Sequence, residues 1–127
     1  MGVDLGRRPA FLMRRGEIHV VDFDPGRGSE ATKRRPAVVV SNDGANAAAT
    51  RLGRGVITVV PISSNIQRIY PFQVRLPARS TGLRQDSKAQ AEQIRSIAVE
   101  RLGERIGTIP AGVMVKIDEA LRLHLAV

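Results

Sequence analysis

The chain has no cysteine among its 127 residues, so it can form neither a disulfide nor a cysteine-based zinc site. It has only two histidines, His19 and His124, which argues against a metal cluster. Aromatic residues are scarce, with three phenylalanines, one tyrosine and no tryptophan, which argues against a stacking platform across a whole sheet. No apolar run approaches the roughly 20 residues of a membrane span. We therefore expect no metal, no other cofactor and no membrane association.

The length suits one domain with one core, and a hydrophobic content of 43% is ordinary for a globular protein. Residues 1–13 are basic and contain only a short apolar run, so we expect a flexible leader followed by a single domain at 14–127. Met13 is an alternative natural start, because organised patterning begins just after it. A chain without cysteine is compatible with a reducing compartment, and the expected location is the cytoplasm.

The formal charge of +8, from 20 basic against 12 acidic residues, indicates a polyanionic partner. Many of the basic residues fall between strand-like runs, where loops can bring them together on one face. The alternative reading is that this charge only keeps the protein soluble.

Short apolar stretches separated by turn residues predict several strands, at 16–24, 36–42, 56–62, 71–76, 87–97 and 106–109. The connection 43–55 is expected to hold one helical turn at 45–50, and 101–105 a helical turn or loop. From residue 111 onward apolar residues recur at helical spacing, which predicts a C-terminal helix with Pro110 in its first turn. We therefore predict a mainly β fold of the α+β type, a small antiparallel barrel or curled sheet with one helix packed on it.

A polar, basic loop at 28–35 runs directly into the apolar strand 36–42, which is expected to be central and buried on both faces. Pro36 fixes its own φ and pushes Arg35 into an extended conformation at the edge of the sheet. A guanidinium held there is a ready cation for a phosphate group.

Several segments, in this order and spacing, resemble the MazF/PemK toxin family of toxin–antitoxin modules. They are RGEI (15–18), VDFDP (21–25), GSE (28–30), RPAVVVSND (35–43), VVPISSN (59–65), QIRSI (93–97) and DEAL (118–121). Each fragment alone is weak, but together they cover nearly all of the chain from 14 to 125.

The resemblance implies an SH3-like barrel with a C-terminal helix that works as a homodimer. It implies a metal-independent endoribonuclease that cuts single-stranded RNA at short sequences and inhibits translation. It also implies a cognate antitoxin whose acidic, flexible tail occupies the RNA groove.

Metal-free cleavage uses the 2′-OH of the RNA itself as the nucleophile and yields a 2′,3′-cyclic phosphate and a 5′-OH. Arg35 matches the family's catalytic arginine and is expected to stabilise the phosphorane electrostatically. Ser63 aligns with a position where many relatives carry threonine, and its hydroxyl can bind a phosphate oxygen or the attacking group. The alternative for Ser63 is a turn residue that caps Asn65.

Further RNA contacts are expected from loop and strand residues that match the family's groove: Ser29, Glu30, Lys33, Asn65, Gln90 and Glu92. Glu30 could accept from a base amino group or pair with Lys33 or Arg34. Gln90 and Glu92 match positions where some relatives carry a catalytic arginine and aspartate. Gln90 cannot supply that charge, while Glu92 could accept a proton or pair with Arg95.

Two other functions remain open on the sequence. A toxin of the same fold that poisons DNA gyrase would need neither Arg35 nor a hydroxyl at position 63, and a non-catalytic RNA-binding barrel would bind without cutting. A pair of catalytic histidines is rejected, because His19 is in a predicted strand where packing is expected and His124 is near the chain end, where a cation suits the helix dipole.

Overall fold

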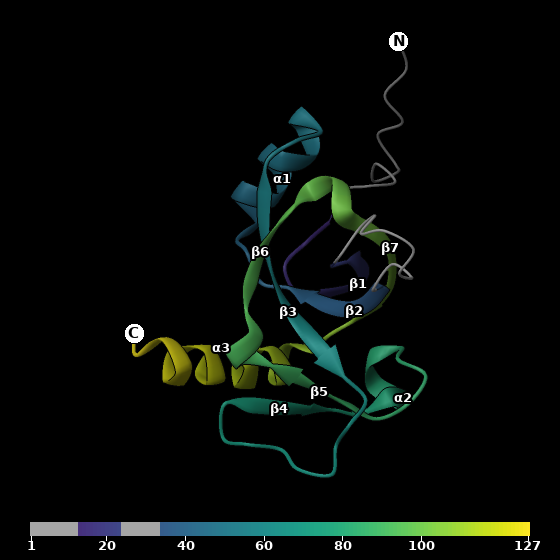
Figure 1. Ribbon diagram of the computed structural model, residues 1–127, viewed down its shortest axis with the longest axis vertical. Helices are drawn as coiled ribbons and strands as arrows, with labels where there is room; N and C mark the ends of the chain where they lie inside the picture. The colour runs from purple at the N-terminus through teal and green to yellow at the C-terminus, as the bar shows by residue number, and fades with distance from the viewer. Residues whose placement is uncertain (1–12, 24–33) are drawn as a thin grey trace, which may run out of the picture.

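The computed structural model describes residues 13–23 and 34–127 (Figure 1). Seven strands form its sheet: β1 (Glu17–Asp22), β2 (Arg34–Val39), β3 (Val56–Ser63), β4 (Gln73–Leu76), β5 (Ser87–Gln90), β6 (Arg95–Ala98) and β7 (Leu102–Thr108). The helices are α1 (Asp43–Leu52), α2 (Ala78–Thr81) and α3 (Ala111–Leu125), with 3₁₀ turns η1 (Ala91–Gln93) and η2 (Val99–Arg101).

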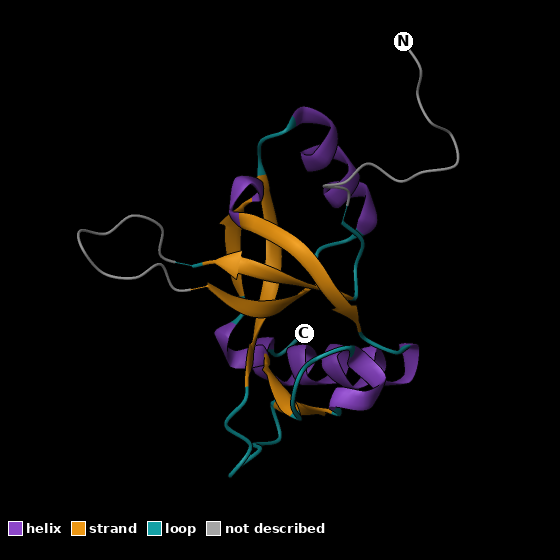
Figure 2. Cartoon of the chain, turned by 90° about the vertical axis from the view of Figure 1, so that its right-hand side faces the viewer, coloured by secondary structure: helices purple, strands orange, loops and turns teal. Residues whose placement is uncertain are grey.

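The strands pair antiparallel in the order β4-β5-β3-β2-β1-β7, and β6 also pairs with β3. Because β4 and β7 end this order without pairing to each other, the described strands form a curled sheet that does not close. Figures 1 and 2 place α3 against one end of the curl and α1 at the other. The predicted class is confirmed: mainly antiparallel β with a C-terminal helix.

The long strand β3 organises the sheet. One edge pairs with β2, through Ala37↔Pro61, while the other pairs first with β6 and then with β5. The three residues Ala91–Gln93 are left over between these two pairings and form η1. The single strand predicted at 87–97 is therefore wrong, because its two halves pair with two different parts of β3.

Two apolar clusters stabilise the fold from opposite faces of β2. Val38 belongs to the α3-side core, which also contains Ile117 of α3, and Val39 belongs to the α1-side core, which also contains Ala49 of α1. Val38, Val39 and Ile117 are each fully buried, and burying such a side chain contributes about 1.5–3 kcal/mol. The prediction that this strand is buried on both faces is confirmed.

The connection after β2 is more ordered than the one helical turn predicted at 45–50. It forms the 10-residue helix α1, which begins where the Asn42 side chain accepts a hydrogen bond of 2.8 Å from the Ala45 amide. It ends at Gly53, whose φ of 67° is the left-handed conformation common after a helix. Asn42 and Gly53 are therefore the sequence features that indicate a full helix here, although the apolar pattern between them is weak.

Three further expectations need correction. Residues 101–105 are not a helical turn, since Leu102–Thr108 is one strand, β7, paired with β1 through a bulged register. The loop at 77–84 contains the short helix α2. Pro110 is the residue before the first turn of α3 rather than within it.

Met13, which we assigned to the leader, is 1% exposed and lies in the α1-side core. Its sulfur is 3.6 Å from the Thr50 hydroxyl of α1. The packed structure therefore includes Met13. No helix in the described ranges combines the length and the hydrophobicity that a membrane crossing requires.

Candidate functional site

A cleft of about 770 Å³ opens where β2 begins and β3 ends, opposite the loop that follows α2. Its described lining combines three arginines, several small polar side chains and an apolar floor. The residues are Val20, Arg34, Arg35, Pro36, Ile62, Ser63, Ser64, Asn65, Gly82, Leu83, Arg84, Gln85, Ser87, Glu104 and Ile106.

Arg35 and Ser63 both line this cleft. The ladder between β2 and β3 ends at the pair Ala37↔Pro61, so Arg35 and Ser63 each lie two residues beyond it, at the start of β2 and the end of β3. Arg35 is exposed, and the half-buried Ser63 accepts a hydrogen bond of 3.1 Å from the Asn65 amide. The cleft therefore presents both a cation and a hydroxyl.

The other predicted RNA contacts divide into three groups. Asn65 lines the cleft, and its Oδ1 accepts a hydrogen bond of 3.2 Å from the Gln67 amide. Ser29, Glu30 and Lys33 lie outside the described residues. Gln90 and Glu92 are not part of the cleft lining.

Gln90 pairs with Gln73 in the β4–β5 ladder, next to the η1 turn that carries Glu92. Glu92 Oε2 accepts a hydrogen bond of 2.7 Å from the Gln73 side chain. Arg95, the alternative partner for Glu92, instead lies over the ring of Phe23 at 5.0 Å. The structure therefore places Glu92 in a structural contact with the first residue of β4.

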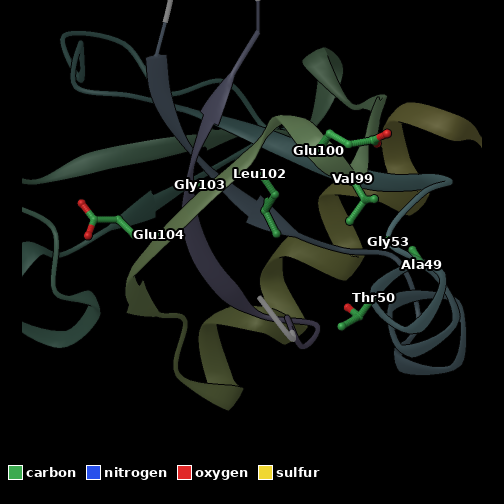
Figure 3. A pocket seen from close by; sticks show the side chains of 8 residues that line it. All are labelled: Ala49, Thr50, Gly53, Val99, Glu100, Leu102, Gly103 and Glu104. Carbon is green, nitrogen blue, oxygen red and sulfur yellow. The ribbon is translucent and has the colours of Figure 1, made fainter. Parts of the chain in front are cut away.

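Glu104 is the only carboxylate among the described residues that line the cleft, and the sequence drew no attention to it. It also borders a second, smaller pocket of about 440 Å³ between α1 and β7. Figure 3 shows its carboxylate directed away from Leu102, Val99 and Thr50 of that smaller pocket. Glu104 was not identified as a site residue because residues 101–105 were not expected to form a strand.

Among the described lining residues, cations outnumber anions, with Arg34, Arg35 and Arg84 against the one carboxylate of Glu104. Arg34 reaches across β1 toward β7, where a Cβ on Gly103 would lie 3.4 Å from its Nη2. An excess of cations in a concave surface attracts a polyanion such as a nucleic acid. Within 13–23 and 34–127 no group of three His, Asp or Glu side chains is placed to hold a metal ion.

The segment that follows helix α2 forms one wall of the cleft, and two glycines let α2 and this segment approach β7. A Cβ on Gly107 would lie 1.9 Å from the Thr81 carbonyl oxygen, which is an impossible contact. Gly82 has a φ of 87°, which L side chains rarely adopt. This close approach brings Leu83, Arg84 and Gln85 over the floor of the cleft.

Asp86 holds the same wall from its other end. Its carboxylate accepts hydrogen bonds from the Ala78 amide at 2.8 Å and from Arg75 Nη2 at 2.9 Å. The bond from Ala78 at the start of α2, followed by the charge of Arg75, lowers the pKa of Asp86.

A carboxyl whose pKa is lowered by folding stabilises the fold above its unfolded pKa of about 3.9, and that contribution disappears as the pH falls through the folded value. We therefore expect Asp86→Asn to lower the melting temperature by a few degrees at most at pH 7, and by nothing at pH 2. Thermal unfolding followed by circular dichroism at both pH values tests this, with Glu100→Gln on the exposed turn η2 as the control. A deficit that persists unchanged at pH 2 contradicts the charge argument.

His19 is buried away from the cleft lining. One ring nitrogen is 2.9 Å from the Gly103 carbonyl oxygen and the other is 3.0 Å from Glu17 Oε1. Glu17 also accepts a hydrogen bond from Arg105 Nη1 at 3.3 Å. This network ties the irregular strand β7 to β1, so His19 has a structural role. His124 is exposed in the last turn of α3.

The curled sheet, the C-terminal helix and the cationic cleft define a small, mainly β protein with a concave surface suited to a polyanion. The family described as "PemK-like, MazF-like toxin of type II toxin-antitoxin system" matches residues 14–125 of the chain. The chain therefore belongs to this family.

Individual relatives of the chain are named as endoribonucleases. Endoribonuclease MazF9 of Mycobacterium tuberculosis is 68% identical over 114 residues, which is 90% of this chain and 97% of that protein. Endoribonuclease EndoA of Bacillus subtilis is 35% identical over 117 residues, covering 91% and 97% of the two chains.

Solved structures show the same fold. The crystal structure of MazE–MazF (Form-II) from Deinococcus radiodurans matches with a TM-score of 0.73 and 28% identity, over 91% of this chain and 97% of that one. The Mycobacterium tuberculosis toxin MazF-mt6 matches with a TM-score of 0.69 and 24% identity, over 87% and 97%.

Proposed function

We propose that this toxin cleaves single-stranded RNA at short sequences without a metal ion, leaving a 2′,3′-cyclic phosphate and a 5′-OH. It is an endoribonuclease of the MazF type, as its family and its 68% identity to a named endoribonuclease indicate. The observation that carries the finer proposal is that Arg35, at the start of β2, and Ser63, at the end of the neighbouring strand β3, line the same cleft.

In the proposed reaction the ribose 2′-oxygen attacks the adjacent phosphorus and the bond from phosphorus to the 5′-oxygen breaks. Arg35 stabilises the phosphorane, because a guanidinium keeps its positive charge and can bind two phosphate oxygens at once. Ser63 donates its hydroxyl hydrogen to a non-bridging oxygen. These contacts strengthen as negative charge develops, which is the condition for lowering the barrier.

The attacking hydroxyl must lose a proton, and Glu104 is the carboxylate that the described cleft offers. We propose that Glu104 accepts this proton, while the departing 5′-oxygen takes one from solvent. Glu92, for which the sequence left open either this role or a pairing with Arg95, is hydrogen bonded to Gln73 outside the cleft lining.

The proposed partners are a second copy of the chain and a cognate antitoxin whose acidic segment occupies the cleft. One solved neighbour is the MazE–MazF structure from Deinococcus radiodurans, and the arginines of the cleft suit an acidic peptide. Exposed apolar side chains on α3, including Val115 at 55% and Leu123 at 60% exposure, are available for self-association.

A gyrase-poisoning toxin of the same fold remains the second candidate by family resemblance alone. It has no use for a paired arginine and hydroxyl in a cationic cleft, so the geometry favours RNA cleavage. A non-catalytic RNA-binding module would need the cations but no carboxylate among them.

Incubation of the purified protein with a long single-stranded RNA in excess EDTA tests the proposal. We expect discrete fragments that end in a cyclic phosphate, because none of the three chemical roles requires a metal ion. Sequencing of the fragment ends identifies the cleaved motif. Intact RNA with retarded mobility indicates binding only, and cleavage that stops in EDTA contradicts the metal-free route.

A further inference from the structure

The connection between β3 and β4 gathers two of the chain's four aromatic side chains into one cluster. The rings of Tyr70 and Phe72 are parallel within 1°, with centroids 5.4 Å apart. The Arg68 guanidinium carbon is 5.6 Å from the Tyr70 centroid, and Arg68 Nη1 donates a hydrogen bond of 3.3 Å to the Tyr70 hydroxyl. Tyr70 is nevertheless 42% exposed. We call Arg68, Tyr70 and Phe72 the stacking cluster.

Buried polar side chains hold this cluster in place. Lys88 is only 8% exposed, and its ammonium group donates a hydrogen bond of 2.8 Å to the Arg68 carbonyl oxygen. Gln73, also 8% exposed, accepts a hydrogen bond of 3.1 Å from the Tyr70 amide. Glu92 in turn accepts from Gln73 at 2.7 Å. A surface loop supported in this way is organised before any ligand arrives.

The connection that carries the cluster also carries residues of the cleft. Lys88 pairs with Ser63 in the β3–β5 ladder, so one residue faces a cleft residue and also holds the cluster. Ser64 and Asn65 of the same connection line the cleft directly. The connection between β3 and β4 therefore links the cleft to the cluster through the chain itself.

We infer that the stacking cluster is a subsite for an unpaired nucleobase of the RNA, next to the cleft. A rigid pair of parallel rings with a guanidinium beside it offers flat apolar and cationic surfaces, which bases stack on with little dependence on sequence. The cluster binds a base outside the reacting phosphate, so it increases RNA affinity without altering the chemical step. This inference rests on the proposed function, since it assumes that the cleft binds RNA.

Tyr70 gives the inference a direct optical test, because it is the only tyrosine and the chain has no tryptophan. The intrinsic fluorescence of the protein therefore comes from the proposed subsite. We would titrate the protein with a mixed-sequence 2′-O-methyl RNA, which cannot be cut, and with an abasic 2′-O-methyl oligomer of equal length and charge. Saturable quenching by the RNA that exceeds quenching by the abasic oligomer supports base stacking.

Variants test the same point by fluorescence anisotropy of a labelled 2′-O-methyl RNA. We expect Tyr70→Ala to raise Kd about tenfold, within the range measured for single base–aromatic contacts. Tyr70→Phe keeps the ring and should change Kd by less than about twofold. Leu52→Ala, an exposed apolar truncation on α1 at the far end of the sheet in Figure 1, should leave Kd unchanged.

Cleavage of a natural RNA by Tyr70→Ala should show a raised KM and an unchanged kcat. Equal RNA affinity of Tyr70→Ala and the parent overturns the subsite, and so does quenching by an acidic peptide but not by RNA. A parent protein that binds the 2′-O-methyl RNA through Tyr70 but cleaves nothing keeps the subsite and removes the proposed function. Cleavage of RNA with no contribution from Tyr70 to RNA affinity removes the subsite and keeps the proposed function.

Discussion

Arg35→Ala is expected to lower the rate of RNA cleavage by about 10²–10³-fold, the cost of removing one oxyanion-stabilising group. The loss should fall mainly on kcat, because the guanidinium interacts most strongly with the charge that develops in the phosphorane. Arg35 is exposed at the start of β2, and no core contact depends on it, so the fold should persist. Single-turnover cleavage of a defined RNA, with circular dichroism to check folding, measures the effect.

Arg34→Ala is the matched control, since Arg34 is the neighbouring exposed cation of the same cleft. If Arg35 acts only through general attraction for RNA, the two variants should lose similar amounts and high salt should erase both effects. A large kcat defect confined to Arg35 indicates a role in the transition state. Cleavage by Arg35→Ala at the parent rate would show that the assignment is wrong.

Glu104→Gln is expected to lower kcat by about 10²–10⁴-fold, the usual contribution of a positioned general base. The amide keeps the shape of the side chain and cannot take up the proton of the 2′-OH. RNA binding should stay the same or become stronger, because the variant removes the one negative charge among the described side chains of a cationic cleft. The kcat for cleavage of a natural RNA and the Kd for a 2′-O-methyl RNA, measured on the same preparation, separate the two effects.

Glu100→Gln provides the comparison, because Glu100 is an exposed carboxylate on η2 that borders only the smaller pocket. It should cleave at the parent rate. The opposite result for Glu104→Gln, faster cleavage with tighter binding, means that the carboxylate merely repels RNA. In that case another group accepts the proton, and the role of Arg35 is unaffected.

The parts of the fold that the sequence predicted correctly are those with a strong local pattern. The continuous apolar run of β2 allows only a strand buried on both faces. The helical spacing of α3 likewise puts Ile117 and Ala120 in the core. The first half of β7 was missed, although the strand predicted at 106–109 overlaps its second half. Gly103 and Gly107 weaken the strand pattern, and the reason for both glycines is the close approach of other segments of the chain.

Of the residues that the sequence named for the candidate site, some line the cleft and others do not. Arg35, Ser63 and Asn65 were named because they border recognisable strands and match a family pattern, and all three line one cleft. Glu92 was named on the same ground, yet it bonds Gln73 outside the cleft lining. The sequence offered no means of telling these two outcomes apart, since each depends on which strand pairs with which.

From its sequence alone, the chain could be read as a small, basic, mainly β protein with a cation at a strand entrance and a resemblance to one toxin family. Local patterns carry this information, because burial periodicity, charge and turn residues act over a few neighbouring positions. Only the tertiary structure decided that Glu104 joins Arg35 in one cleft and that Lys88 of β5 holds the stacking cluster. Strand register and the packing of α2 on β7 bring those groups together, and both arise from contacts between distant parts of the chain.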